Sequence, residues 1–293
     1  MHRGRTSGRE LALIVLAACA FATASPIAKS ITGLSFAGIG AARCAVAAVA
    51  LLAMAPTTTW RAVAALDARK RLALVGAGLL LAAHFGLFLA GLLATSLPAA
   101  AALVSLEPVA VVMAAWVAFG VRPGGRELSG IALATLGAAV VAQGAGHGEH
   151  RLAGDALVLG AVVLFGAYVA FARGLRDAMP TTPYAACVYT VAALALAPLA
   201  RVLDAPGGAI PSSTWAGVTA LGLVPTLLGH TLTQRAARHV SPSIVALVSP
   251  GETVGAILIG AATGRVPSVV EWTGAAIIVA GASVTVMGAR ASE

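Results

Sequence analysis

The chain repeats itself at a fixed spacing of 144 residues. Residues 98–145 align without a gap with residues 242–289. The matched residues that restrict the backbone are Pro98/Pro242, Pro123/Pro267, Gly120/Gly264, Gly130/Gly274, Gly137/Gly281 and Gly144/Gly288. Alanine matches mean little in an alanine-rich chain, but proline and glycine restrict or free the backbone at particular positions, so chance does not reproduce this set. The two segments are therefore expected to share one structure.

The same spacing extends to the start of the chain, where it pairs Phe21 with Phe165. We therefore expect two homologous halves, residues 1–148 and residues 149–293, each folding as one repeat of the same unit.

Composition sets the environment of this fold. The chain is 59% hydrophobic and only 10% charged, with a mean hydropathy of +0.93, which is too apolar for one soluble domain of 293 residues. A helix needs roughly 20 apolar residues to cross about 30 Å of hydrocarbon. Ten segments qualify, near residues 11–28, 36–55, 72–93, 97–119, 128–145, 153–173, 183–202, 214–233, 242–262 and 269–288. They lack the alternating pattern of barrel strands, so we expect an all-α integral membrane protein with ten transmembrane helices.

Basic residues predict the orientation, because Lys and Arg that flank short spans are retained in the cytoplasm. The N-terminus and one set of alternate turns carry most of them, including four between residues 61 and 71. We therefore expect both termini in the cytoplasm and the protein in the cell (inner) membrane. The net charge of +8 is then a topology signal rather than the footprint of a nucleic-acid partner.

Five spans in each half is an odd number, so the second half must cross the membrane in the opposite sense to the first. Inverted repeats of this kind characterise secondary transporters, which alternate access around a site near the middle of the bilayer.

The first hydrophobic segment also fits a signal peptide, with a lipoprotein-like box before Cys19. Its match to residues 155–173 favours a retained helix, because removing it would leave nine spans and one incomplete repeat. The cysteines Cys19, Cys44 and Cys187 all fall inside spans. Packing roles are therefore expected for them rather than disulfides or metal ligands.

Short loops leave no room for a soluble catalytic or nucleotide-binding domain. The sequence has no GxxxxGK[ST] motif, which argues against transport driven by ATP. We therefore expect no cofactor, no metal and no enzymatic activity.

Two glutamates stand about halfway along their spans, where a charge is costly. Glu107 precedes Pro108, and Glu252 follows Pro250 and Gly251. Proline frees a backbone carbonyl four residues earlier, so helix breaks at Pro108, Pro250 and Gly251 would offer backbone groups beside each carboxylate. The alternative is that each glutamate only satisfies an orphaned backbone group or a polar neighbour.

Three further polar residues lie within spans. His84 falls mid-span and requires a partner there, as a functional group or as a satisfied core residue. His230 lies closer to the expected cytoplasmic end and is read as a gate or an interfacial residue. Arg43 is a candidate for binding or, alternatively, a structural anchor.

These residues resemble those of the drug/metabolite transporter (DMT) superfamily, EamA type, over essentially the whole chain. The resemblance rests on Arg43, on AAHFGLFLAGLLATS, on LVSLEPV and on VPTLLGHTLTQRAARHVSPSIVALVSPGETVGA. The chain departs from the family at Pro250, which precedes its glutamate instead of following it, and at Val121, where an acidic residue is usual. The resemblance implies a ten-helix permease, proton-linked or facilitative, that often exports amino acids, metabolites or drugs.

The sequence thus favours a secondary transporter whose cavity is lined by the third, fourth, eighth and ninth spans. Two carboxylates and two imidazoles near one arginine favour a zwitterionic or cationic organic solute over a polyanion. A proton is the candidate coupling ion, the bilayer is the other partner, and a monomer and a homodimer both remain open. The alternatives are a membrane pore or channel, and an integral membrane enzyme acting on lipid.

Overall fold

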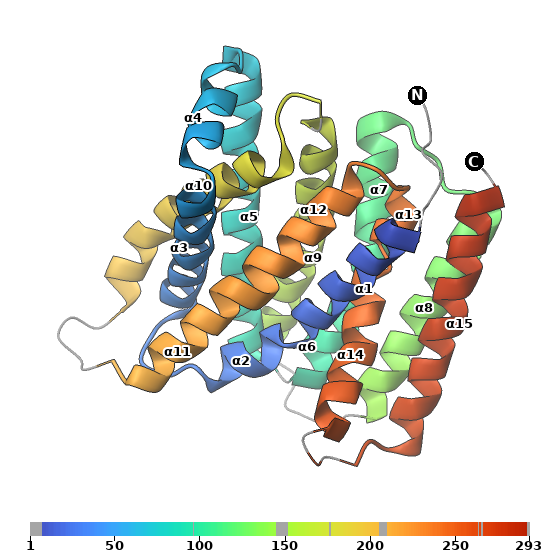
Figure 1. Ribbon diagram of the computed structural model, residues 1–293. Helices are drawn as coiled ribbons and strands as arrows, with labels where there is room; N and C mark the ends of the chain where they lie inside the picture. The colour runs from blue at the N-terminus through green and yellow to red at the C-terminus, as the bar shows by residue number, and fades with distance from the viewer. Residues whose placement is uncertain are drawn as a thin grey trace.

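The computed structural model describes residues 8–95, 97–144, 152–175, 177–204, 210–262, 264 and 266–291. Every regular element within these residues is a helix, and the helices form one bundle (Figure 1). Nine helical segments of the described chain are long and apolar enough to span a membrane, and Glu107–Phe119 is a shorter apolar helix. The multi-pass, all-helical part of the expectation is therefore confirmed.

The first half contains α1 (Gly8–Ala22), α2 (Ala24–Ser30), α3 (Phe36–Met54), α4 (Pro56–Ala64), α5 (Ala68–Ala94), α6 (Leu97–Val104), α7 (Glu107–Phe119) and α8 (Gly125–Gly144). The second half contains α9 (Leu152–Gly174), α10 (Thr181–Leu203), α11 (Ser212–Leu221), the π-helix η1 (Gly222–His230), α12 (Thr231–Ala237), α13 (Pro242–Val245), α14 (Val248–Ala262) and α15 (Val269–Ala291).

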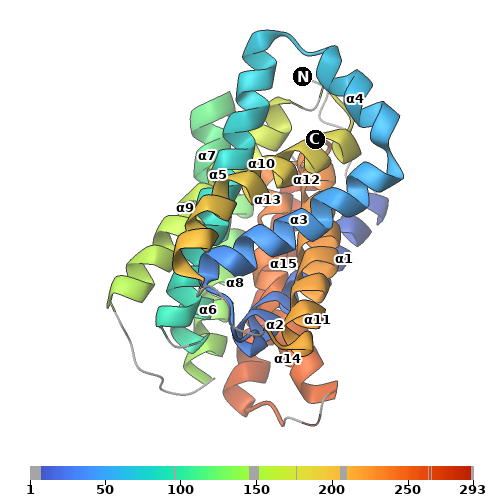
Figure 2. The same ribbon diagram turned by 90° about the vertical axis from the view of Figure 1, so that its left-hand side faces the viewer.

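The two ends of the bundle are named as Figure 1 shows them. At the upper end α1 begins, α15 ends and α7 is followed by α8; at the lower end lie α2, α11 and the end of α14. Figure 2 shows α3 crossing the bundle at a slant, with α4 at its upper end. Residues 56–64, expected as part of a polar turn, are thus the helix α4.

The fourth and ninth spans are each divided into two helices, at positions that differ from one another. Pro108 lies in the first turn of α7, directly after the expected break. The ninth span breaks between Val245 and Val248, so Pro250 and Gly251 lie inside α14 and do not themselves form the break. The reason is that Pro250 lacks the N–H that would bond to residue 246, and a proline is tolerated in the first helical turn. The helix is therefore interrupted near residue 246, whose carbonyl lacks its donor, and not at the proline itself.

The sequence pattern predicts a regular α-helix for the eighth span. The structure instead has the π-helical stretch η1 within it. Pro225 has no N–H for the carbonyl of Leu221, and the Thr226 hydroxyl donates to that oxygen instead, at 2.7 Å. The wider turns of η1 set the positions of Thr226 and His230.

Acidic side chains accept backbone hydrogen bonds at the N-termini of α5 and α15. Glu271 Oε2 accepts a hydrogen bond from Ser268 N (2.7 Å), and Ser268 Oγ accepts one from Glu271 N (3.2 Å), which is a reciprocal cap of α15. Asp67 accepts from Lys70 N at the start of α5, and this backbone hydrogen bond lowers the pKa of Asp67 below its usual value. Glu271 therefore places a carboxylate at the N-terminus of α15, where it interacts favourably with the helix dipole.

The helices α8 and α15 approach each other closely enough that only glycine fits at their contact. A Cβ atom at Gly130 would lie 2.6 Å from the Gly281 carbonyl oxygen, and one at Gly137 would lie 2.8 Å from that of Gly274. Gly130 and Gly274 are one pair at the 144-residue spacing, and Gly137 and Gly281 are another. The repeat spacing therefore converts the contact between Gly130 and Gly281 into the contact between Gly274 and Gly137.

The same exchange relates two other helix pairs, α1 with α14 and α9 with α7. A Cβ atom at Gly255 would lie 2.9 Å from Ala22 Cβ, and one at Gly166 would lie 3.0 Å from Val111 N. Ala22 is equivalent to Gly166, and Val111 is equivalent to Gly255. The first helix of each half therefore contacts the broken span of the other half.

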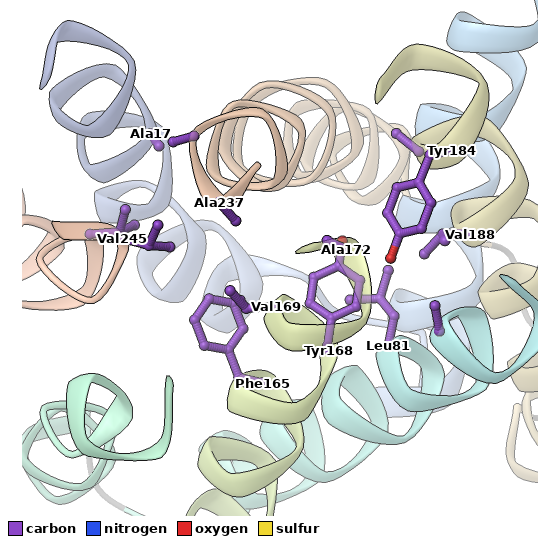
Figure 3. Packing of buried hydrophobic residues seen from close by; sticks show 14 of the residues in the cluster. Ala17, Leu81, Phe165, Tyr168, Val169, Ala172, Tyr184, Val188, Ala237 and Val245 are labelled. Carbon is purple, nitrogen blue, oxygen red and sulfur yellow. The ribbon is translucent and has the colours of Figure 1, made fainter. Parts of the chain in front are cut away.

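The described residues form three apolar clusters: a small one between α8, α14 and α15, and two larger ones. The upper cluster joins buried residues of α1, α5, α9, α10, α12 and α13; among them are Ala17, Leu81, Phe165, Tyr168, Tyr184, Val188, Ala237 and Val245 (Figure 3). The lower cluster lies around the ends of α2, α5 and α11; its members include Ile31, Leu89, Leu92, Val158 and Leu221. The polar residues singled out from the sequence lie between the two clusters.

Candidate functional site

The five polar candidates of the sequence analysis line one cavity. Arg43 comes from α3, His84 from α5, Glu107 from α7, His230 from η1 and Glu252 from α14. The cavity has a volume of about 40 Å³. The structure therefore brings together residues that are up to 209 positions apart in the chain. The second span contributes as well as the third, fourth, eighth and ninth.

Phenylalanines and small apolar residues complete the wall of this cavity. Phe21 and Phe165, which are equivalent in the two halves, lie on it together with Phe85, Phe88, Ala24 and Val104. Phe21, Phe85 and Phe165 pack with the upper cluster, whereas Ala24, Phe88 and Val104 pack with the lower one. The cavity thus has apolar packing on both sides.

Arg43 is 1% exposed and is held by two contacts. Its Nε donates a hydrogen bond to Thr226 Oγ1 at 2.8 Å, and its guanidinium carbon lies 4.1 Å from the centroid of the Phe85 ring. Thr226 was not among the site residues predicted from the sequence. Its signal was available, because Thr226 directly follows Pro225 and satisfies the carbonyl that Pro225 leaves free.

Tyr189 supports the same arrangement from α10. Its hydroxyl donates to the Thr226 carbonyl oxygen (3.0 Å) and lies 3.0 Å from Thr231 Oγ1. The position of Arg43 is therefore set by the path of η1.

His84 has a defined ring orientation. Its Nδ1 lies 2.9 Å from the carbonyl oxygen of Ala161, which can only accept, so Nδ1 carries the proton of this hydrogen bond. In the neutral ring the lone pair is then on Nε2. The ring also stacks on Phe88, with 6.1 Å between centroids.

His230 is surrounded by rings. Its centroid lies 4.7 Å from that of Phe21, 5.0 Å from Phe85, 5.9 Å from Tyr168 and 6.2 Å from His84. The residue is 3% exposed, and its Nδ1 has no hydrogen-bond partner in the part of the chain that the structure describes. This buried nitrogen is one polar group that a bound molecule or water could satisfy.

The two carboxylates lie near each other and near Arg43. Glu107 is 8% exposed and interacts electrostatically with the Ser249 side chain. Glu252 interacts electrostatically with both Glu107 and Arg43. Two like charges in a confined apolar space disfavour simultaneous ionisation, so one guanidinium and one bound cation or proton would balance them.

The volume of the cavity limits what this conformer can hold. A cavity of about 40 Å³ can hold water but is far smaller than the roughly 300 Å³ or more of a typical small-molecule pocket. An organic solute does not fit without movement of the surrounding helices.

A much larger cavity of about 1110 Å³, which we call the vestibule, lies at the upper end. It is bounded by the turn between α7 and α8, the turn between α9 and α10, and α12. Its arginines are Arg122, Arg173, Arg235 and Arg238, and its acidic residues are Glu127 and Asp177. This space was not predicted from the sequence, because its wall joins turns that are distant in the chain.

Two tyrosines separate the vestibule from the small cavity. Tyr168 contacts His230, and the Tyr184 ring lies 5.1 Å below the guanidinium carbon of Arg238 in the vestibule wall. Both tyrosines are 0% exposed, and Figure 3 shows them pointing into the space between α5, α9 and α10. Their hydroxyls have no hydrogen-bond partner among the described residues. Such unsatisfied groups are unusual in a permanent core.

Within the described residues, no group of three or more His, Cys, Asp and Glu side chains is placed to hold a metal ion.

Membrane-spanning helices with charged groups gathered in an enclosed cavity, and a vestibule leading toward it, define a multi-pass membrane transporter. The sequence model of the EamA-like transporter family matches residues 8–143 and again residues 152–287. The chain belongs to this family, within the DMT superfamily, and carries two copies of its unit.

A solved structure, described only as the crystal structure of a protein, is similar in fold. It superposes with a TM-score of 0.78 at 20% identity, and the match covers 97% of this chain and 99% of that chain. A likeness at this identity shows the fold alone. No curated protein sequence matches the chain.

Proposed function

We propose that this protein is a secondary transporter that exports a small organic solute by alternating access. The observation that carries the proposal is the convergence of Arg43, His84, Glu107, His230 and Glu252 on one cavity between two apolar clusters. Polar groups of this kind are costly inside a membrane, so they are rare there and mark substrate or ion pathways.

The two EamA units are proposed to be inverted repeats, with boundaries at residues 1–148 and 149–293. The junction between them lies within residues 145–151, which are outside the described residues. Support comes from the exchanged contacts of α1 with α14 and α9 with α7, because such reciprocal contacts are the signature of two-fold symmetry. In addition, α1 runs from the upper end downward, whereas its equivalent α9 runs upward (Figure 1).

Ten membrane crossings follow if α6 and α7 together count as one. Neither helix is long enough to span alone, with 8 and 13 residues, but they continue one another across the break before Glu107. We further propose the cell (inner) membrane as the location and the vestibule end as the cytoplasmic end. The four arginines in the vestibule wall agree with the rule that positive residues stay inside.

The proposed solute is zwitterionic or cationic. The cavity offers two carboxylates, Glu107 and Glu252, against one guanidinium, and that guanidinium already contacts Thr226 and Phe85. A polyanion would face an excess of negative groups there, whereas an ammonium group would replace like-charge repulsion with attraction. The aromatic walls suit an apolar body next to the charge.

Alternating access requires this cavity to widen, since it now holds only water-sized molecules. The proposed cycle opens the space between Tyr168 and Tyr184 toward the vestibule, and separates the lower cluster toward the other side. The unsatisfied hydroxyls of these two tyrosines would then gain partners in the open path.

The test is an unbiased comparison of internal and external metabolites in cells that express wild-type protein, the Glu252→Gln variant or no transporter. We expect at least one amine-bearing solute to accumulate outside only with the wild type. An unchanged profile in all three strains, despite matched membrane expression, would contradict the proposal.

A further inference from the structure

At the lower end, α5 of the first half and α9 of the second are in backbone contact. A Cβ atom at Gly91 would lie 2.8 Å from the Gly154 carbonyl oxygen, so neither glycine can be replaced without moving a helix. Beside this crossing, Thr95 Oγ1 donates a hydrogen bond to Asp155 Oδ1 at 2.7 Å. The two halves are thus closed against each other on this side.

The equivalent crossing at the upper end joins α1 and α12, which are in contact beside the vestibule. Shifting Gly91 by the 144-residue spacing gives Arg235, and shifting Gly154 back by it gives Glu10. The positions that hold two glycines at the closed end therefore hold two long side chains of opposite charge at the end with the vestibule.

In the present conformer these two residues are not joined. Arg235 is exposed in the vestibule wall, and Glu10 is partly buried with contacts to other groups. The ion pairs among the described residues do not include one between Glu10 and Arg235.

We infer that Glu10 and Arg235 form the inner gate and pair with each other when the vestibule closes. The inference rests on the proposed function: in an alternating pair of inverted repeats, the upper crossing takes up in one state the arrangement that the lower crossing has in the other. As α1 and α12 approach in the way that α5 and α9 do now, the carboxylate and the guanidinium meet. Long side chains keep the backbones further apart than glycines do, so the upper crossing closes through side chains.

The chemistry of the pair suits a gate that must reopen in each cycle. An ion pair next to water is weak, because solvent screens it and two flexible side chains must be ordered to form it. The glycine crossing at the lower end has no such screening. The two gates therefore differ in strength, and the resting conformer is the one with the vestibule open.

Cross-linking tests the inference without a transport assay. In a background lacking Cys19, Cys44 and Cys187, we introduce Glu10→Cys and Arg235→Cys and apply an oxidant or a short bifunctional thiol reagent. We expect a cross-link, and we expect a third cysteine introduced by Thr95→Cys to become reactive to a membrane-impermeant maleimide only in the cross-linked protein. The matched control is Thr95→Cys with Asp155→Cys, which should cross-link readily and leave a cysteine introduced by Arg235→Cys reactive.

Charge exchange separates gating from folding. Glu10→Arg and Arg235→Glu should each change the transport rate by about threefold, as expected for one solvent-exposed pair, and the double exchange should restore it. If transport depends on Glu252, but no cross-link forms and the double exchange does not restore the rate, the gate would be overturned. The proposed function would be unaffected. If the cross-link forms and exposes the cysteine at position 95, but no solute is transported, the gate would be supported and the proposed function contradicted.

Discussion

The hydroxyl of Ser249 donates a hydrogen bond to the carbonyl oxygen of Val104, 3.0 Å away. This carbonyl is the one that Pro108 leaves without a helical donor, four residues further along the chain. The carbonyl freed at the break of the fourth span is therefore satisfied by a residue of the ninth span, and Ser249 also interacts electrostatically with Glu107. The two broken spans stabilise each other at the edge of the cavity.

Ser249→Ala should destabilise the protein, because it leaves the Val104 oxygen unsatisfied in an apolar region. The expected loss is about 1–3 kcal/mol in the free energy of unfolding, seen as a lower melting temperature in detergent. Ser283→Ala is the matched control, since the Ser283 hydroxyl bonds back to Val279 on an exposed helix face. Equal melting temperatures for the two variants would mean that the Ser249–Val104 bond contributes nothing.

Thr226→Val should weaken transport more than Thr226→Ser, because only the hydroxyl can accept from Arg43 and donate to Leu221. We expect a fall in transport of about tenfold for Val, corresponding to about 1.4 kcal/mol, and little change for Ser. Thr190→Val controls for the loss of a hydroxyl that only bonds back to its own helix. Equal activity of Thr226→Val and wild type would remove Arg43 from the site.

Glu252→Gln should abolish or uncouple transport while the protein remains folded and inserted. The amide keeps the shape of the carboxyl group but can neither carry charge nor exchange a proton, so attraction for a cationic group is lost. Uptake or efflux of the identified solute is measured as a function of pH. Glu271→Gln, which removes a buried carboxylate at the start of α15, is the control and should transport normally. A wild-type rate and pH profile for Glu252→Gln would assign Glu252 to structure.

His84→Ala and Glu107→Gln should alter apparent affinity or solute preference more than expression. Both side chains line the cavity, and the ring of His84 packs against Phe88 and bonds to Ala161. Competition between related solutes, at matched membrane levels of each variant, measures the effect. A uniform loss of expression with unchanged preference would indicate a packing role.

Cysteine labelling tests the orientation. Single cysteines within residues 61–71 should be labelled only from the cytoplasm, and cysteines within residues 146–152 only from outside. Labelling of either region from the opposite side would break the inverted-repeat argument.

The sequence was sufficient to predict the repeat, the membrane class and the residues that meet in the cavity. The reason is that a charged residue in an apolar span has few acceptable places, so Glu107 and Glu252 had to face the interior. The position of the break in the ninth span was harder to predict, because Pro250 shows that one backbone donor is missing but does not show where the helix is interrupted. That position depends on which carbonyl finds another partner.

Other features depend on packing between distant parts of the chain. Thr226 lies 183 residues from Arg43, so the bond between them leaves no local pattern. The aromatic surroundings of His230 come from α1, α5 and α9 together, and only the equivalence of Phe21 and Phe165 hinted at them. The vestibule requires the relative positions of two turns and of α12, which hydropathy does not encode.

The glycine contacts of α8 and α15 place a limit on how the two copies of the duplicated unit can diverge. A side chain at Gly130 would collide with the backbone at Gly281, and one at Gly274 would collide with that at Gly137, so a change in either copy is rejected by the other. No such mutual constraint acts in the cavity, where the counterpart of Glu107 is Gly251. The duplicated halves are therefore held alike where they touch each other and are free to differ where they line the cavity.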